Sequence, residues 1–315
     1  MHGKNVVIMV WKQDPNAGFG DLLRGTVCLY QFSKRFNFTL IVDTQLHPVS
    51  KLLVSIPHMY SNYVLENQSE IINAINSRDK LEILLKNKLS CDKPLMISTN
   101  VEPPNNMTND CKRFMRLLLH PTDEFNRFFI EMRARFNIPN NYTIAHFRLG
   151  DQELMNKTID VANYQMLGEI VNFHMTNTPN LFIMSDSLEF KKYLCKRIRP
   201  EFVGRIIPST PIHLSHPDAL DVEKIKETMF DFMLLINARL IKTHSKYMWI
   251  SNFVKWAGNI FNVPVLDMKP PKVSMNLQVV RSTKITPLIH QAPANKPVIT
   301  KPLISKHNVS FRKMF

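Results

Sequence analysis

The chain has 315 residues, more than one domain usually contains, so we expect two domains. Its 44% hydrophobic and 10% aromatic residues suffice for packed cores, and its four cysteines show no Cys-x-x-Cys spacing, as expected of free thiols. No segment approaches the roughly 20 consecutive apolar residues of a membrane span, and the start has no signal-peptide cleavage pattern. We therefore expect a soluble, cytoplasmic protein.

The net charge of +14 comes mainly from the last part of the chain. Residues 269–315 contain nine Lys or Arg and no Asp or Glu, whereas the other 31 basic and 26 acidic residues leave residues 1–268 at +5. Six prolines interrupt this segment, so we expect an extended or disordered basic tail. Nucleic-acid binding through the tail is one alternative function. The tail has only two aromatic residues, Phe311 and Phe315, and hence no stacking platform for bases.

The beginning of the chain predicts a strand, a helix and a second strand, which normally form a right-handed parallel crossover. Residues 45–120 are harder to interpret. The expected elements are strands Lys4–Trp11 and Phe38–Asp43, helices Asp21–Phe36, Ser69–Asn87 and Asp123–Phe136 (the last capped by Thr122 or Asp123), and a Pro/Asn-rich loop at Glu102–Asp110.

The second part of the chain shows the alternation of strands and helices more clearly. Such alternation predicts a parallel sheet covered on both faces. Ile138-Pro-Asn-Asn141 separates the two parts, so we expect domains at 1–137 and 138–268 and a tail at 269–315. The expected elements are strands Thr143–Phe147, Leu181–Met184, Phe202–Ile207, Arg239–Thr243 and Val263–Leu266, and helices Ala162–Met175, Leu188–Arg197, Val222–Asn237 and Trp249–Phe261.

A glycine loop lies between the first strand and the first helix. It contains Gly18, Phe19 and Gly20, followed by Asp21 and Arg24. The glycines permit a tight turn and a close backbone approach, and the helix N-terminus that follows favours anions. The loop lacks the third glycine of a dinucleotide fingerprint and the Gly-Lys-Ser/Thr of a P-loop. An ordinary turn with a solvated Arg24 remains an alternative.

The segment His146-Phe-Arg-Leu-Gly-Asp151 ends a buried strand with a cation, a glycine and a carboxylate. Open α/β sheets bind ligands at the carboxyl ends of their strands. A guanidinium fixed there can bind a phosphate through two parallel hydrogen bonds, so Arg148 is a candidate phosphate ligand. An Arg148–Asp151 ion pair that only stabilises the turn is the alternative.

Two further segments place polar residues at strand ends or inside an apolar helix. Ser185 and Asp186 follow a hydrophobic strand, where they could accept hydrogen bonds from a base or ribose or simply cap the next helix. Asp231 lies within a largely apolar helix, where an unpaired carboxylate is unfavourable. His244 and Ser245 leave the next strand toward a helix N-terminus, which suits phosphate.

Taken in chain order, these segments resemble the motifs of the fucosyltransferase superfamily, which includes α-1,2-, α-1,6-, Nod-factor and protein O-fucosyltransferases. The matching stretches are Gly18-Phe-Gly-Asp21, His146-Phe-Arg-Leu-Gly-Asp151, Met184-Ser-Asp186, Asp231 and Ser245-Lys-Tyr-Met-Trp249. The resemblance covers roughly residues 5–268. It implies an α/β fold of GT-B type, in which two Rossmann-like domains with parallel sheets face a cleft. The first domain is then on the acceptor side and the second binds the nucleotide sugar.

The resemblance also implies roles for individual residues. Arg148 would contact the β-phosphate of GDP-fucose and stabilise the departing GDP, and His146 and Asp151 would shape the loop around it. The glycine loop from Gly18 to Arg24 would face the cleft. The implied donor-binding residues are His146, Arg148, Ser185, Asp186, Asp231, His244, Ser245 and Tyr247. Leu149 and Met248 differ from residues that many relatives have at these motif positions.

Breaking a glycosyl–phosphate bond places negative charge on the diphosphate, which an arginine and helix N-termini can stabilise. The sequence has no Asp-x-Asp of the kind that holds a divalent cation with a nucleotide, so we expect no metal and no cofactor. Inversion requires a base, for which Asp21, Asp151 and Glu153 are candidates. The sequence thus predicts an inverting transferase that uses GDP-fucose and a glycan acceptor. A transferase of the same fold with another nucleotide sugar is the main alternative.

Overall fold

The computed structural model describes residues 5–12, 18–55, 58–74, 77–89, 93–150, 161–210, 212 and 222–268. They belong to one compact unit, Met1–Lys269. The second unit, Pro270–Phe315, lies outside the described residues, so the basic tail stays a prediction. Within the described ranges, no helix combines the length and the apolar character needed to cross a membrane.

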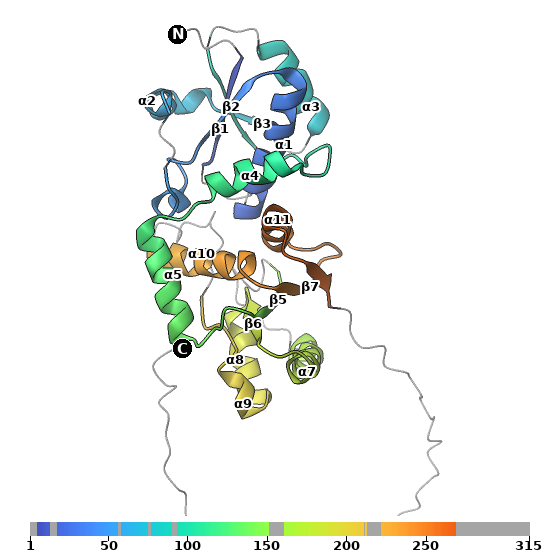
Figure 1. The fold of residues 1–315 in the computed structure, drawn as a ribbon. Coiled ribbons are helices and arrows are strands. Elements are labelled where there is room, and N and C mark those ends of the chain that lie inside the picture. The colour runs from blue at the N-terminus through green and yellow to red at the C-terminus, as the bar shows by residue number, and fades with distance from the viewer. Residues whose placement is uncertain are drawn as a thin grey trace, which may run out of the picture. The chain divides into compact units, whose positions relative to one another are not determined.

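The first half of this unit, residues 5–135, contains a parallel sheet with strand order β2-β1-β4-β3 (Figure 1). The strands are β1 (Val6–Val10), β2 (Thr39–Asp43), β3 (Ile72–Ala74) and β4 (Leu95–Thr99). The helices are α1 (Phe19–Phe36), α2 (Ser61–Glu66), α3 (Arg78–Lys88), α4 (Asn109–Leu118) and α5 (Asp123–Arg135), with short 3-10 turns η1 (Pro48–Lys51) and η2 (Gln68–Glu70).

The second half, residues 143–268, contains another parallel sheet with strand order β6-β5-β7-β8 (Figure 1). Two parallel sheets built from alternating strands and helices confirm the predicted α/β class. The strands are β5 (Thr143–Arg148), β6 (Leu181–Ser185), β7 (Leu240–Ser245) and β8 (Val265–Asp267). The helices are α7 (Val161–Asn177), α8 (Leu188–Arg197), α9 (Pro200–Val203), α10 (Val222–Ile236) and α11 (Asn252–Phe261).

Several helix ends have local causes that the sequence shows. The hydroxyl of Thr122 accepts a hydrogen bond from the Phe125 amide at 3.2 Å and so caps α5, as predicted. Helices α1 and α11 end at Asn37 and Asn262, whose φ angles of 55° and 60° lie in the left-handed region. Asparagine tolerates that conformation better than most residues and can therefore end a helix there.

The last helix of the second half packs against the first half. Helix α11 contacts α1 and α4. A Cβ atom on Gly20 of α1 would lie only 2.7 Å from Asn252 Cβ and 2.9 Å from Phe253 N, so glycine permits this close approach. Helix α5 in turn packs on α10 through Phe129 and Phe230, whose ring centroids are 5.7 Å apart. The apolar core therefore continues from one half into the other.

Two predicted elements are wrong, and one strand was missed. The expected helix Ser69–Asn87 is a short turn, strand β3 and helix α3, because Ser77 caps a helix that begins only at Arg78. The expected strand Phe202–Ile207 begins instead as helix α9, which Pro200 initiates. Only Ile206 of that segment forms a bridge, to Ile183 of β6. The expected loop Glu102–Asp110 is confirmed as far as Thr108, after which α4 begins, and strand β4 was missed altogether.

Candidate functional site

The carboxyl ends of β5, β6 and β7 bring three of the predicted segments together. Strand β5 lies between β6 and β7, with Phe147 opposite Ser185 on one side and Arg148 opposite Ser245 on the other. Asp186 directly follows β6. The register of this sheet therefore places Arg148, Asp186 and Ser245 at one edge, where open α/β sheets bind their ligands.

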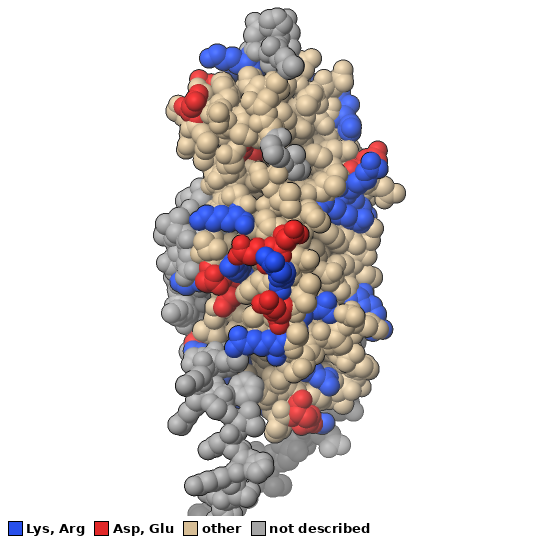
Figure 2. Space-filling model, turned by 60° about the vertical axis from the view of Figure 1, so that its left-hand side comes forward, with Lys and Arg blue, Asp and Glu red and all other residues tan. Residues whose placement is uncertain are grey.

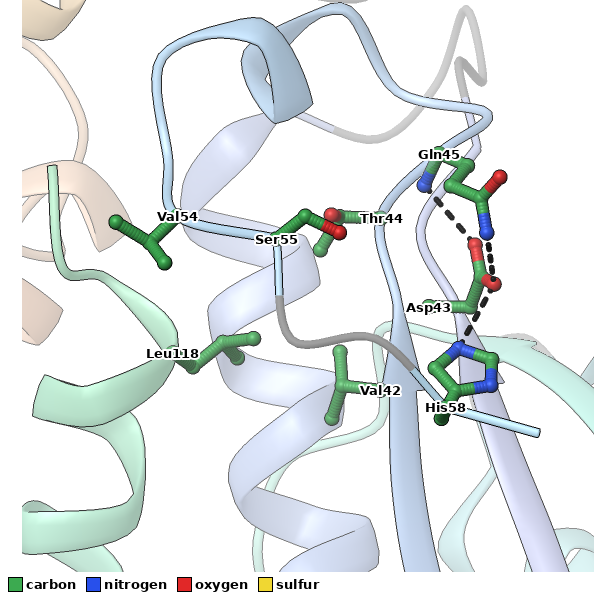
Figure 3. A pocket seen from close by; sticks show the side chains of 8 residues that line it. All are labelled: Val42, Asp43, Thr44, Gln45, Val54, Ser55, His58 and Leu118. Carbon is green, nitrogen blue, oxygen red and sulfur yellow. Dashed lines mark hydrogen bonds and ion pairs between the residues drawn. The ribbon is translucent and has the colours of Figure 1, made fainter. Parts of the chain in front are cut away.

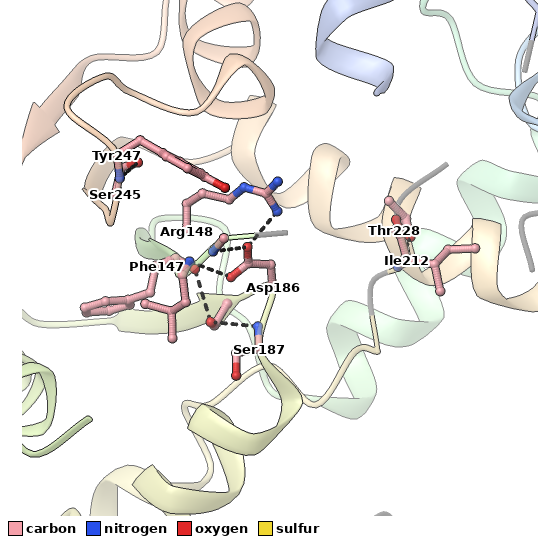
Figure 4. A network of polar contacts seen from close by, with 11 residues as sticks. Phe147, Arg148, Asp186, Ser187, Ile212, Thr228, Ser245 and Tyr247 are labelled. Atoms are coloured by element: carbon pink, nitrogen blue, oxygen red, sulfur yellow. Dashed lines mark hydrogen bonds and ion pairs between the residues drawn. The ribbon is translucent and has the colours of Figure 1, made fainter. Parts of the chain in front are cut away.

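Arg148 and Asp186 form the centre of this edge (Figure 4). Arg148 Nη1 donates to Asp186 Oδ2 at 2.6 Å. The same carboxylate accepts hydrogen bonds from the amides of Leu149 at 2.8 Å and Gly150 at 3.3 Å. The side chain of Arg148 is 17% exposed and that of Asp186 only 8%. Asp186 thus shapes the turn after β5 and holds the guanidinium at the surface of the sheet edge.

The ion-pair partner of Arg148 that the structure shows comes from the neighbouring strand end. The sequence offered Asp151 as a partner, but residues 151–160 lie outside the described part of the chain, and with them the candidate base Glu153. Burial raises the pKa of the Asp186 carboxyl, and the Arg148 guanidinium and two backbone amides oppose that rise. A carboxylate with three charge-assisted or backbone donors is a rigid support for the arginine beside it.

His146 lies two residues before Arg148 and is 5% exposed. Burial, followed by the positive charges of Arg148 and Lys191, lowers the pKa of His146 to about 3. Its Nδ1 atom is enclosed and has no hydrogen-bond partner among the described residues. The imidazole is therefore neutral at physiological pH, so that Arg148 rather than His146 supplies positive charge at this point of the edge.

Ser185 has a local structural role. Its hydroxyl donates to the carbonyl of Phe147 at 3.1 Å and accepts from the amide of Ser187 at 3.1 Å. The next hydroxyl, that of Ser187, accepts from the amide of Phe190 at 3.1 Å and caps α8. Of the two alternatives for this segment, capping therefore belongs to Ser187, while Ser185 connects the ends of β5 and β6.

The segment after β7 lies directly against the turn after β5. The amide of Lys246 donates to the carbonyl of Arg148 at 2.9 Å, and the Ser245 hydroxyl accepts from the amide of Tyr247 at 3.2 Å. Gly150 has a φ of +115°, and a Cβ atom there would lie 3.2 Å from the Tyr247 hydroxyl. Tyr247 stacks on Trp249 with ring centroids 5.1 Å apart. Position 150 is thus restricted to glycine by both its φ angle and its neighbour.

His244 and Asp231, which the resemblance implied as donor ligands, are partly or fully buried and contact other groups of the protein. The His244 ring lies 6.0 Å from that of Phe147, and burial lowers the pKa of His244. Asp231 is 2% exposed and its Oδ1 accepts from the Ser209 hydroxyl at 2.8 Å. Burial raises the pKa of Asp231 to about 6, although a neighbouring ammonium and the Ser209 hydroxyl oppose the rise.

The glycine loop belongs to the contact between α1 and the second half. Gly18 caps α1, and its amide donates to Asp21 Oδ2 at 3.0 Å. Asp21 Oδ1 accepts from Asn252 Nδ2 at 3.0 Å and lies 2.9 Å from Arg24 Nη2. Phe19 packs edge-on against Phe232 of α10, with ring centroids 5.1 Å apart. Both oxygens of Asp21 thus have partners, and Arg24 is ion-paired rather than only solvated.

The first sheet has a polar group at the carboxyl end of β2 that the sequence analysis missed (Figure 3). Asp43 is 1% exposed; its Oδ1 accepts from the Gln45 amide at 2.9 Å, and its Oδ2 lies 3.0 Å from His58 Nε2. These side chains border a hollow of about 310 Å³, counted with the solvent at its mouth. Arg148 was singled out as a charged residue at the end of a predicted strand. Asp43 ends the predicted strand Phe38–Asp43 in the same way, so the same signal could have indicated this group.

Across the ranges that the structure describes, no three His, Cys, Asp or Glu side chains are grouped as metal ligands would be. In the middle of the face in Figure 2, Lys or Arg and Asp or Glu lie side by side. Lys226, for example, contacts both Glu124 and Glu223.

The sequence matches no protein-family model, and the search of curated proteins found no match to it. Solved structures are similar, at low sequence identity. NodZ α-1,6-fucosyltransferase soaked with GDP-fucose has 11% identity and a TM-score of 0.50, over 82% of this chain and 92% of NodZ. POFUT1 in complex with GDP has 11% identity and a TM-score of 0.49, over 85% and 99% of the two chains. Arabidopsis thaliana FUT1 in complex with GDP has 11% identity and a TM-score of 0.47, over 86% and 71%.

The chain has a fucosyltransferase-like GT-B fold. The match to NodZ extends over most of both chains, so it includes both parallel sheets rather than a single Rossmann-like unit. The resemblance predicted from the short motifs is thereby confirmed for the fold. What the protein binds and transfers is a separate question, which depends on the side chains at the carboxyl edge of the second sheet.

Proposed function

We propose that the protein is an inverting glycosyltransferase that transfers fucose from GDP-fucose to a glycan acceptor without a metal ion. The observation that carries this proposal is Arg148, held by Asp186 at the carboxyl edge of the second sheet. The fold in which this pair occurs resembles that of NodZ, a fucosyltransferase whose crystals were soaked with GDP-fucose.

The proposed chemistry follows from the charges at this edge. When the glycosyl–phosphate bond breaks, negative charge develops on the leaving diphosphate, and a guanidinium fixed in advance stabilises it without reorganising. The Asp186 carboxylate, which also binds the Leu149 and Gly150 amides, keeps Arg148 in one orientation. Because Arg148 and helix N-termini can supply the charge stabilisation, the reaction requires no divalent cation.

The contacts of Asp21 bear on which carboxylate we propose as the base for the acceptor hydroxyl. Asp21 has a backbone amide, an asparagine amide and the Arg24 guanidinium as partners, and these contacts occupy both of its carboxylate oxygens. Asp151 and Glu153 therefore stay the candidates for the base, and we assign Asp21 to the contact between α1 and α11 instead.

Nucleotide selectivity tests the donor. We expect GDP and GDP-fucose to raise the melting temperature in the presence of a chelator, with smaller effects of GDP-mannose and UDP. A shift with UDP but not GDP would favour the alternative, a transferase of this fold that uses another nucleotide sugar. If none of the four compounds changed the melting temperature, the proposed function would be wrong.

Substitution of Arg148 tests the mechanism. Loss of one preorganised charge-stabilising donor typically lowers kcat by about 10²–10³, so Arg148→Ala should lose transfer activity by that factor in an assay with GDP-fucose. Arg148→Lys keeps the charge but not the planar fork, and should retain part of the activity. Arg197→Ala, at an exposed position of α8, is the matched control. Full activity of a folded Arg148→Ala would contradict the mechanism.

A further inference from the structure

A lysine with no exposed surface lies behind the Arg148–Asp186 pair. Lys191 of α8 is 0% exposed. Its Nζ donates to the carbonyl of Ser209 at 2.6 Å and lies 3.3 Å from the hydroxyl of the same residue. A buried ammonium is costly unless it is paired and hydrogen-bonded, so its surroundings must supply negative charge.

The negative charge comes from α10 through Ser209. The Ser209 hydroxyl accepts from Lys191 and donates to Asp231 Oδ1 at 2.8 Å, which is consistent with the one donor and two lone pairs of a hydroxyl. Asp231 is the largest favourable charge acting on Lys191, and Asp186 is the next. A continuous chain of hydrogen bonds therefore connects α8, the segment around Ser209 and α10.

This chain of hydrogen bonds lies next to the candidate donor site. Helix α8 begins directly after Asp186, at the Ser187 cap, so Lys191 lies one turn into the helix that follows the carboxylate supporting Arg148. The positive charges of Arg148 and Lys191 both lower the pKa of His146. Burial lowers the pKa of Lys191, and the carboxylates of Asp231, Asp186 and Glu227 oppose that fall.

We propose that Lys191 is a positioning residue of the donor site, which holds α8 and α10 together behind Arg148 and maintains Asp231 as a carboxylate. The proposal rests on the proposed function, because it assigns this network to nucleotide-sugar binding. Lys191 itself, being fully buried, touches no ligand. Its loss would leave Asp231 with no cation among the described residues to offset its burial.

The charges that face Asp231 determine what the loss of Lys191 does. Lys191 faces it from α8, the Ser209 hydroxyl from the segment before α10, and Glu227 from α10 itself. Burial raises the pKa of Asp231 to about 6, Lys191 and Ser209 oppose the rise, and Glu227 adds to it. Without the ammonium the pKa of Asp231 rises further, which shifts Asp231 toward its protonated form.

The test measures GDP-fucose binding by calorimetry from pH 5.5 to 8.5. This probe is chosen over GDP because its diphosphate has no terminal phosphate that titrates near pH 6. We expect the wild-type affinity to fall toward acid with a midpoint near pH 6, as Asp231 takes up a proton. In Lys191→Met the midpoint should move above pH 7. When the midpoint lies one pH unit above the assay pH, only about a tenth of the protein has Asp231 ionised, which corresponds to about a tenfold loss of affinity.

Two further variants separate positioning from folding. Lys191→Arg keeps the charge and should restore the wild-type midpoint at least in part. The double variant Lys191→Met with Asp231→Asn leaves neither group of this pair charged, so it is the comparison to use if the single variant does not fold. It should bind GDP-fucose weakly and without the acid midpoint.

The outcomes distinguish the two proposals. If wild type binds GDP-fucose and Lys191→Met has the same affinity and midpoint, Lys191 has no positioning role, while the proposed function stands. If the double variant binds like wild type, the charges of Lys191 and Asp231 are irrelevant to the donor and the inference is equally overturned. If wild type binds no GDP-fucose at any pH, the proposed donor and the inference both fall.

Discussion

Replacing His146 by glutamine should change how stability depends on pH. Burial lowers the pKa of His146 to about 3, from an ordinary value of 6.5. Between these values the unfolded chain holds a proton that the folded chain does not, so the folded state loses stability as pH falls. A pH of 5 is about 1.5 units below the pKa of the unfolded imidazole. At about 1.36 kcal/mol per unit, the free energy of unfolding is lower by about 2 kcal/mol.

His146→Gln has no such proton to gain. Relative to wild type, the variant should therefore become about 2 kcal/mol more stable when the pH is lowered from 7.5 to 5. Wild type alone would not reveal this effect. The pKa of Asp231, raised to about 6, makes the folded state gain stability as pH falls through 6 toward 4, in the opposite direction. Asp231 is common to both proteins, so it cancels in the comparison.

The assay is urea unfolding at the two pH values, followed by the fluorescence of the buried Trp11 and Trp256. His120→Gln is the matched control, because His120 is exposed. Its difference from wild type should be the same at both pH values. If His146→Gln behaved like this control, the imidazole would not be held neutral in the folded protein, and the description of the site's charges would be wrong.

Three other substitutions test the packing and the turn of the site. Gly20→Ala places a Cβ atom 2.7 Å from Asn252 Cβ and should cost about 1–3 kcal/mol in urea unfolding, whereas Gly204→Ala, with nothing within 4 Å, should cost less than 1 kcal/mol. Equal effects would contradict the close approach of α1 and α11. Asp186→Asn removes a charged acceptor of three hydrogen bonds and should lower stability by about 1.5–3 kcal/mol at pH 7.5; an unchanged melting temperature would show that the carboxylate does not support the turn. Gly150→Ala, at a φ of +115°, should weaken GDP-fucose binding in calorimetry more than it lowers the melting temperature, and unchanged affinity would separate this turn from the donor site.

The sequence predicted the elements whose causes are local. Strand β5 is apolar and ends at a glycine-containing turn, and Thr122 caps α5 through its own hydroxyl, so both were found. The parallel sheets followed from strands separated by helices. Strand β3 was missed because it has only three residues, Ile72–Ala74. Its partner residues in β4, Ile97 to Thr99, lie much later in the sequence, so no local pattern indicates the pairing.

The candidate site was predicted in its residues but not in its contacts. The sequence indicated that Arg148 and Asp186 lie at strand ends, but it could not show that they pair, because that depends on Phe147 standing opposite Ser185 in the sheet. The burial of Lys191 was likewise not predicted from the sequence. Its position four residues after the Ser187 cap and three before Leu194 places it on the inner face of α8, which is the pattern to examine in such helices.

The packing of α11 on α1 has a consequence for synthesis on the ribosome. The first half is complete in sequence by the end of α5, but the surface of α1 near Gly20 is covered only when residues 252–261 have been made. At translation rates of about 5–20 residues per second, that surface stays open for on the order of ten seconds. A nascent chain that carries the first sheet alone therefore exposes apolar side chains such as Phe19, and depends on α10 and α11 to cover them.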